Sequence, residues 1–156
     1  MAEWIEAGAT APKFTLTAHD GSKVKLSSLA GKTVILYFYP KDDTPGCTKE
    51  ACGFRDARAA LARRNAVVVG VSPDGPEKHA AFRTKYKLPF TLLCDPDHAV
   101  AKAYGAWREK TLYGKKTLGL VRSTFVIDGG GRVIKVFKAV RPDAHAAQVL
   151  EALATP

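Results

Sequence analysis

The sequence predicts an α/β fold, with a mixed central sheet flanked by helices and an N-terminal β-hairpin. Continuous apolar runs over residues 33–39 and 66–72 indicate buried strands. Helical patterns follow both runs, and strands that alternate with helices form a parallel sheet with helices on both faces. Two strands near the C-terminus, joined by three glycines, add an antiparallel hairpin.

The elements can be justified in chain order. Residues 14–17 alternate between apolar and polar, and a turn at Asp20-Gly21 returns the chain in a first hairpin. Thr33 to Tyr39 is rich in β-branched and aromatic residues, as a central strand is, and Pro40 ends it. The later predicted elements are strands over 66–72, 90–94, 123–128 and 132–138 and helices over 76–86, 97–104 and 144–154. We expect a single domain over residues 1–156.

Residues 107–119 are polar and contain glycines, so we expect a loop there. Tyr104, Trp107 and Tyr113 are expected to pack in the core or against this loop, or else to line an access groove. Gly129, Gly130 and Gly131 join two strands and do not open a helix, so we interpret them as a turn and not as a phosphate-binding loop.

A helix is predicted to start directly after the first buried strand. Thr44 suits the N-cap, where its hydroxyl accepts a free backbone N–H, and Pro45 suits the first helical position. Cys47 then stands third in a helix that continues to about Arg64. Helical spacing places Cys47, Ala51, Phe54 and Leu61 on one face.

This placement favours a reactive thiol at Cys47. Only the thiolate attacks, and unpaired N–H groups and partial positive charge at a helix N-terminus lower a thiol's pKa. The Thr44 hydroxyl can also point at the sulfur or at a bound oxygen. Pro40 and Pro45 stiffen the loop and restrict water. A distant cation would help further, and Arg122 is a candidate that sequence alone does not bring near the thiol.

Cys52 lies five residues after Cys47, close enough along the chain to trap an oxidised thiol as a disulfide. In an intact helix the two Cα atoms would lie roughly 8–9 Å apart. A disulfide needs less than about 7 Å. We therefore expect that pairing of these cysteines requires the first helical turns to unwind. Cys52 could instead be a packed small apolar residue. Cys94, at a strand end, is expected to be a buried apolar thiol, and the sequence leaves its role open.

Composition argues against several classes of protein: secreted disulfide-rich, membrane-spanning, nucleic-acid-binding and metal-binding proteins. The three cysteines and the acidic, weakly apolar N-terminus argue against a secreted disulfide scaffold, so we expect a cytoplasmic protein. No apolar run reaches the roughly 18–20 residues of a membrane span. The net charge is +9, but the basic residues are scattered, so we expect a solvated surface and no nucleic-acid partner. The four histidines are isolated, so neither a metal nor a cofactor is expected.

Residues 38–52, Phe-Tyr-Pro-Lys-Asp-Asp-Thr-Pro-Gly-Cys-Thr-Lys-Glu-Ala-Cys, closely resemble the active-site segment of peroxiredoxins. They look most like the subgroup called peroxiredoxin Q or bacterioferritin comigratory protein. Its Pro-x-x-x-Thr-x-x-Cys pattern is met by Pro40, Thr44 and Cys47. A second segment over 122–128, Arg-Ser-Thr-Phe-Val-Ile-Asp, resembles the family's arginine signature, and the similarity spans about residues 5–152.

The resemblance implies a thioredoxin-like fold and thiol-dependent reduction of hydrogen peroxide and organic hydroperoxides. Cys47 matches the peroxidatic cysteine, which becomes a sulfenic acid. Arg122 matches the residue that stabilises the thiolate and the peroxide, Thr44 the one that hydrogen-bonds the peroxide, and Pro40 the one that shields the site. Glu50 helps to orient this network, and Cys52 matches the resolving cysteine. The resulting disulfide would be reduced by thioredoxin or a similar dithiol, and members of this type are usually monomers.

Two other readings remain open on the residues. A thiol–disulfide reductase of thioredoxin type is disfavoured because no Cys-x-x-Cys pair opens the helix. A basic nucleic-acid-binding module would bind DNA with steep salt dependence, independently of Cys47.

Overall fold

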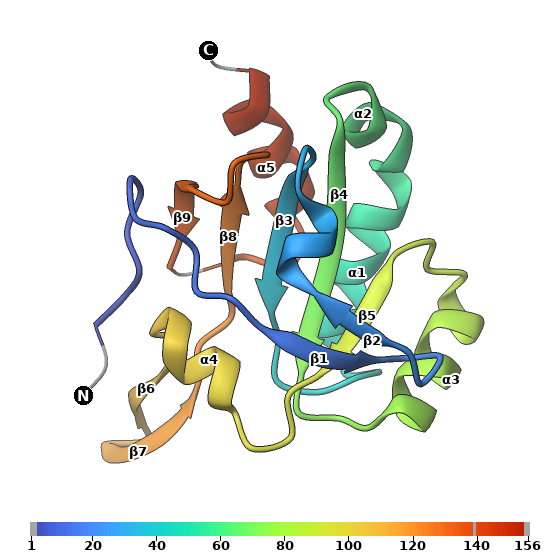
Figure 1. Cartoon of the computed structure of the whole chain (residues 1–156). Helices are drawn as coiled ribbons and strands as arrows, with labels where there is room; N and C mark the ends of the chain where they lie inside the picture. The colour runs from blue at the N-terminus through green and yellow to red at the C-terminus, as the bar shows by residue number, and fades with distance from the viewer. Residues whose placement is uncertain (1–2, 139, 155–156) are drawn as a thin grey trace.

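The computed structural model describes residues 3–138 and 140–154. Its main sheet has seven strands in the order β2-β1-β5-β4-β3-β8-β9 (Figure 1). Strand β4 pairs in parallel with both β3 and β5, whereas the two hairpins at the edges are antiparallel. The mixed sheet with an N-terminal hairpin is therefore confirmed, and it is the sheet of a thioredoxin-like fold. The strands are β1 (Thr15–Ala18), β2 (Lys23–Lys25), β3 (Thr33–Phe38), β4 (Ala66–Ser72), β5 (Thr91–Cys94), β6 (Trp107–Leu112), β7 (Lys115–Leu120), β8 (Ser123–Ile127) and β9 (Val133–Phe137).

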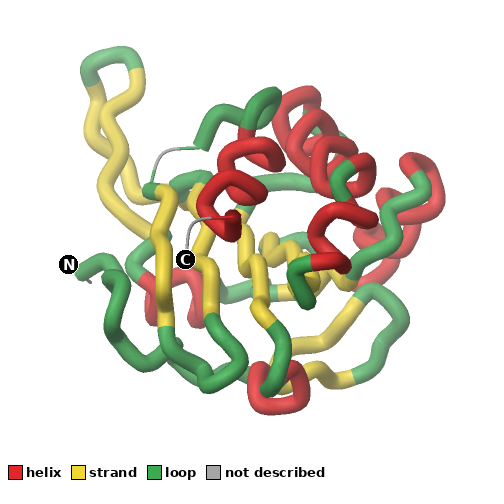
Figure 2. Tube along the Cα trace, turned by 90° about the horizontal axis from the view of Figure 1, so that it is seen from above, coloured by secondary structure: helices red, strands yellow, loops and turns green. Residues whose placement is uncertain are grey.

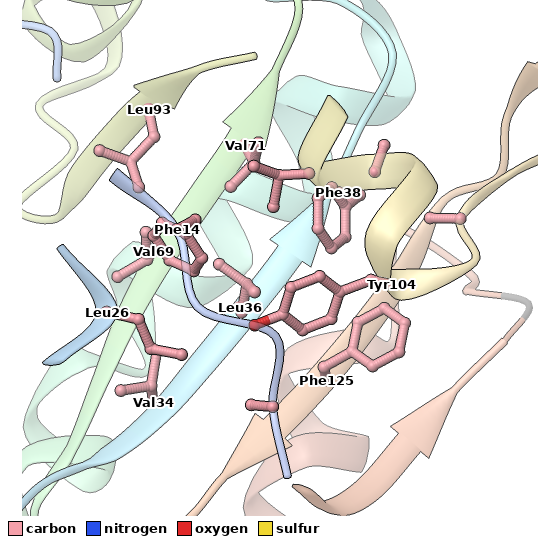
Figure 3. Packing of buried hydrophobic residues seen from close by; sticks show 14 of the residues in the cluster. Phe14, Leu26, Val34, Leu36, Phe38, Val69, Val71, Leu93, Tyr104 and Phe125 are labelled. Carbon is pink, nitrogen blue, oxygen red and sulfur yellow. The ribbon is translucent and has the colours of Figure 1, made fainter. Parts of the chain in front are cut away.

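Helices lie on both faces of this sheet, as predicted. One face is covered by α1, α2, α3 and α5, which pack on a core that includes Phe54, Leu61, Phe82 and Val149. The other face is covered by α4 and the N-terminal segment, which carry Tyr104 and Phe14 (Figures 1 and 3). The helices are η1 (Leu26–Leu29, a 3-10 helix), α1 (Pro45–Asp56), α2 (Arg58–Arg63), α3 (Pro76–Tyr86), α4 (Ala99–Tyr104) and α5 (His145–Ala154).

Strand β3 lies near the middle of the sheet because almost all of its side chains are apolar and buried. Successive side chains of a strand point to opposite faces. Val34, Leu36 and Phe38 enter the cluster beneath α4, which Figure 3 shows. Ile35, Tyr37 and Tyr39 enter the cluster beneath α1. The side chains of β3 therefore belong to two different cores, and a short loop after Phe38 leads from the strand to the start of α1 at Pro45.

The predicted loop over residues 107–119 is wrong. The segment forms a two-stranded ribbon, β6 paired with β7 over Trp107–Leu112 and Lys115–Leu120, which stands out from the body in Figure 2. Tyr113 and Gly114 have φ values of 52° and 77° and make its two-residue turn. Among the described residues, β6 and β7 form backbone strand pairs only with each other and stay outside the main sheet. Most of their side chains are therefore polar, and the apolar pattern of a buried strand is missing. Tyr113, expected to pack, is 96% exposed at the tip, whereas Tyr104 is buried.

The helix predicted to run to Arg64 is in fact two helices. Ala57 has φ −87° and ψ 1°, which ends α1 and starts α2. Phe54 and Leu61 nevertheless enter the same core, so the predicted buried face is correct. The break means that α1, which carries both Cys47 and Cys52, is a separate short unit.

Candidate active site

Cys47 lies in the first turn of α1, where the sequence predicts it. Thr44 has an extended backbone at the N-cap, Pro45 occupies the first helical position, and the Thr48 N–H donates to the Thr44 carbonyl at 2.8 Å. The Cys47 side chain is 1% exposed and shares a cluster with Ala51. The N–H groups that precede Thr48 have no helical acceptor, so partial positive charge gathers beside the sulfur.

The structure brings Arg122 to this sulfur. Its Nη2 donates to Cys47 Sγ at 3.3 Å, across 75 positions of the chain. Arg122 stands between β7 and β8, and β8 pairs with β3. The sheet therefore delivers the guanidinium to the end of β3, where α1 begins. Burial opposes the charge of Arg122, but Glu50 and Cys47 outweigh burial and raise the pKa of the guanidinium.

Glu50, one turn after Cys47, completes this contact set. Its Oε1 accepts a hydrogen bond from Arg122 Nη1 at 2.8 Å, and its side chain is fully buried. Burial raises the pKa of Glu50 to about 7, although Arg122 acts against that rise. Its second oxygen and the hydroxyl of Tyr37 are buried without a hydrogen-bond partner among the residues that the structure describes. Glu50 therefore titrates near neutrality while it holds the arginine.

Gly46 is a site residue that the sequence analysis missed. A Cβ at position 46 would lie 3.2 Å from Arg122 Nη2 and 3.5 Å from Pro142. Contacts at 3.2 Å are tighter than side chains normally make, so a side chain here would displace the guanidinium. The glycine directly before the cysteine was the available signal, but its reason becomes visible only when Arg122 is in place.

Thr44 and Pro40 lie on the loop that precedes α1. Thr44 is the N-cap residue, as predicted, but its hydroxyl donates to the Lys41 carbonyl at 3.0 Å and makes no bond to a helix N–H, so the predicted capping bond is wrong. A hydroxyl that donates to a carbonyl keeps its lone pairs free as acceptors. Pro40 ends β3 at the surface and is exposed. The described contacts place neither side chain against Cys47 Sγ.

All three cysteines are free thiols. Cys52 is partly buried in the same intact helix as Cys47, and Cys94 is buried at the end of β5. Because α1 is continuous between Cys47 and Cys52, their Cα atoms stand about 8–9 Å apart. The dithiol structure therefore keeps the two sulfurs out of disulfide range. Burial and the carboxylates of Asp42 and Asp74 raise the pKa of Cys94.

A second buried hydrogen-bond network holds Asp42, in the loop between β3 and α1, and the sequence did not predict it. His79 Nδ1 stands 2.6 Å from Asp42 Oδ2, and its Nε2 stands 2.9 Å from the Leu93 carbonyl. Tyr39 donates to the other Asp42 oxygen at 2.5 Å. The backbone N–H of Asp42 donates to Asp74 at 2.6 Å. These partners come from four segments, so only the tertiary fold assembles them.

Among residues 3–138 and 140–154, no group of three or more histidine, cysteine or acidic side chains is placed to hold a metal ion. A search of the same residues finds no helix with the length and apolar character that crossing a membrane requires.

The comparisons with known proteins agree with one another. The AhpC/TSA family profile matches residues 7–136. Peroxiredoxin Bcp of Bacillus subtilis is 49% identical over 96% of this chain and 95% of its own length, and Peroxiredoxin Bcp of Escherichia coli is 44% identical over 90% of each. Xanthomonas campestris peroxiredoxin Q superposes with a TM-score of 0.87 at 36% identity, covering 98% of this chain and 96% of that one.

A further solved structure, of the Xanthomonas campestris bacterioferritin comigratory protein, is described as giving insights into alkyl peroxide reduction activity. It has a TM-score of 0.87 at 35% identity over 99% of this chain and 98% of its own. With Cys47, Arg122 and Glu50 in contact at the start of α1, the chain belongs to the AhpC/TSA family, in its Bcp or peroxiredoxin Q branch, and is a thiol-dependent peroxidase.

Proposed function

We propose that Cys47 is the residue that attacks the peroxide. Its thiolate sulfur attacks the terminal hydroxyl oxygen of the peroxide, so that an S–O bond forms as the O–O bond breaks, and Cys47 becomes a sulfenic acid. The departing alkoxide or hydroxide takes a proton and leaves as alcohol or water. The observation that supports this proposal best is the 3.3 Å contact of Arg122 Nη2 with Cys47 Sγ beside free helix N–H groups.

Arg122 is proposed to act on both reaction partners. Its guanidinium is a planar fork, and here one branch holds Glu50 while the other donates to the sulfur. During the attack, negative charge moves from the Cys47 sulfur to the departing peroxide oxygen, and the Arg122 guanidinium can stabilise it at both positions. Glu50 orients the fork and moderates its charge. Thr44 would accept a hydrogen bond from the peroxide, and Pro40 would shield the thiol from bulk water.

Cys52 is proposed to resolve the sulfenic acid. Its sulfur attacks Cys47, the S–S bond forms as the S–O bond breaks, and the hydroxyl leaves as water with the Cys52 proton. This step needs the turns of α1 between the two cysteines to unwind, because disulfides require Cα atoms within about 7 Å. Thioredoxin or a similar dithiol would then reduce the disulfide. A reducing compartment suits this cycle, so we also propose a cytoplasmic protein.

The substrates are proposed to be hydrogen peroxide and organic hydroperoxides, and the role antioxidant defence. We propose that the whole chain works as one domain, because strands from both halves of the chain form a single seven-stranded sheet. A monomer suffices, since Cys47, Cys52 and Arg122 all come from one chain and two of them share α1.

Three serine variants and mass spectrometry test this proposal. Cys47→Ser should abolish peroxide turnover. Cys52→Ser should complete one turnover, resist recycling by thioredoxin, and accumulate sulfinic acid on Cys47 under excess peroxide. Cys94→Ser is the matched control. It removes the third thiol of the chain, which is buried away from α1, and this variant should turn over peroxide normally. The proposal fails if stoichiometric peroxide places the sulfenic acid on Cys52 or Cys94.

A further inference from the structure

Tyr86, the last residue of α3, contacts both flanks of the segment that carries the two cysteines. Its hydroxyl donates to Asp43 Oδ1 at 2.6 Å, just before α1 begins. Its carbonyl accepts a hydrogen bond from Arg55 Nη1 at 2.8 Å, near the end of α1. Asp43 and Arg55 enclose residues 44–54, and these contain Cys47 and Cys52. One residue of α3 therefore holds the chain on either side of both thiols.

The contact at Asp43 is reinforced by its neighbours. Lys85 Nζ bonds the other carboxylate oxygen of Asp43 at 2.8 Å. Hydrogen bonds from Lys85 and then from Tyr86 lower the pKa of this carboxyl, so it stays ionised at neutral pH. Asp43 also has a φ of 58°, in the left-handed region, which aspartate enters more readily than most residues other than glycine. The two partners on α3 add hydrogen bonds from outside to this backbone turn.

The residue before this turn cannot move freely either. Asp42 is buried, with its carboxylate bonded to Tyr39 and His79 and its N–H bonded to Asp74. The backbone turn at Asp43 therefore connects Asp42, which is held in place, to the start of α1. Inside the segment Glu50 is held by Arg122, whereas Cys52 is only partly buried. Unwinding that starts at Thr44 is consequently limited upstream by the contacts of Asp43 with α3.

We propose that the C-terminal turn of α3 controls the unwinding of α1 that lets Cys47 and Cys52 form a disulfide. Its contacts determine which residues unwind and how readily they do so, and Tyr86 is a positioning residue for the resolving step. This inference rests on the proposed roles of the two cysteines. The stronger the hold at Asp43 and Arg55, the longer the Cys47 sulfenic acid waits for Cys52. A second peroxide can meanwhile oxidise it to the sulfinic acid. The α3 contacts therefore determine the balance between resolution and inactivation.

Tyr86→Phe tests the upstream contact, because it removes the hydroxyl and keeps the ring packed on Phe82, 5.4 Å away. Tyr104→Phe is the matched control. It also removes one hydroxyl hydrogen bond, from Tyr104 to the Pro12 carbonyl at 2.7 Å, but on the opposite face of the sheet. In the dithiol protein, amide exchange over residues 44–54 should rise about three- to tenfold in Tyr86→Phe and stay unchanged in Tyr104→Phe, as expected for one charge-assisted hydrogen bond.

The resolving step is measured after one equivalent of hydrogen peroxide, by acid quenching and mass spectrometry of the disulfide. Tyr86→Phe should form it about three- to tenfold faster than Tyr104→Phe and yield less sulfinic acid under excess peroxide, which matches the effect on exchange. Equal rates and equal exchange in the two variants would overturn the inference, as would slower disulfide formation in Tyr86→Phe. The exchange measurement uses no peroxide, so it remains decisive even if the assignment of Cys47 and Cys52 were to fail.

Arg55→Gln tests the downstream contact. It removes the donor to the Tyr86 carbonyl, so fast exchange should extend from residues 44–54 to the helix break at Ala57. Arg58→Gln, an exposed position at the start of α2, is its control and should leave that limit in place. An unchanged limit in Arg55→Gln would show that Tyr86 does not hold this end of the segment.

Discussion

The two faces of the main sheet each bury a carboxylate, and they treat it differently. Beneath α4, Asp95 accepts the backbone N–H groups of Val100 and Ala101 at 3.1 and 2.9 Å. Beneath α1, one oxygen of Glu50 accepts from Arg122, and the other has no partner among the described residues. The first carboxylate is fully committed to holding a helix. The second is held by one cation, Arg122, that also contacts Cys47.

The aromatic residues show the same contrast. Tyr104, the last residue of α4, packs against Phe38 and Phe125 and donates its hydroxyl to the Pro12 carbonyl. Tyr37, beneath α1, is equally buried, but its hydroxyl is unpaired within the described part of the chain. Buried polar atoms without partners cost stability. Among the described residues, the two buried side-chain oxygens that lack a hydrogen-bond partner, one on Tyr37 and one on Glu50, both lie on the face that carries Cys47.

Arg122→Lys should give the largest effect, on activity. An ammonium cannot donate to the sulfur and to Glu50 with the geometry of the fork, so peroxide attack should slow by about 10²-fold. Stopped-flow kinetics of Cys47 oxidation measure this. Arg108→Lys is the control, because Arg108 stacks on Trp4 and bonds Gly105 away from the thiol. Equal rates in the two variants would remove Arg122 from the reaction.

Glu50→Gln should change how stability depends on pH. The folded-state pKa of Glu50 is raised to about 7, from 4.5. Between these values the unfolded chain has already lost the proton that the folded chain keeps, so the wild type loses stability as pH rises. From pH 5 to pH 8 its unfolding free energy should fall by about 2 kcal/mol more than that of Glu50→Gln. Parallel urea-denaturation profiles for both proteins would contradict the raised pKa.

Asp95→Asn should reduce stability at every pH without the same change in activity. One amide oxygen replaces two carboxylate oxygens that accept N–H groups at the start of α4, so one N–H is left unpaired. We expect the unfolding free energy to drop by about 2 kcal/mol. Peroxide attack per folded molecule should remain that of the wild type. A variant that is stable but slow would show that this face, too, serves the reaction.

Tyr37→Phe and Tyr104→Phe should give the smallest change in unfolding free energy and the most direct comparison of the two faces. Removing the unpaired hydroxyl of Tyr37 should leave stability unchanged or raise it by up to about 1 kcal/mol, whereas removing the bonded hydroxyl of Tyr104 should lower it by about 1 kcal/mol. Chemical denaturation of both variants at one pH is sufficient. Equal losses would mean that the Tyr37 hydroxyl has a partner in solution.

Local patterns predicted most of the fold because the physical causes are local. The strand over 66–72 and the helix over 76–86 have the predicted bounds, since a continuous apolar run and a proline at a helix start act on neighbouring residues. The ribbon of β6 and β7 was missed for the complementary reason. Its strands bury little, so no apolar period marks them, and only the turn at Tyr113 and Gly114 carried a signal.

The sequence by itself determined that a thiol would stand in the first turn of a helix behind a buried strand, because a proline at the first helical position and apolar spacing are properties of a few adjacent residues. Only the tertiary structure decided what surrounds that thiol. Arg122 reaches Cys47 because β8 pairs with β3, and Tyr86 reaches Asp43 and Arg55 because the fold brings the end of α3 to both ends of α1. Such contacts join residues 31 to 75 positions apart, and no periodicity in the chain encodes separations of that kind.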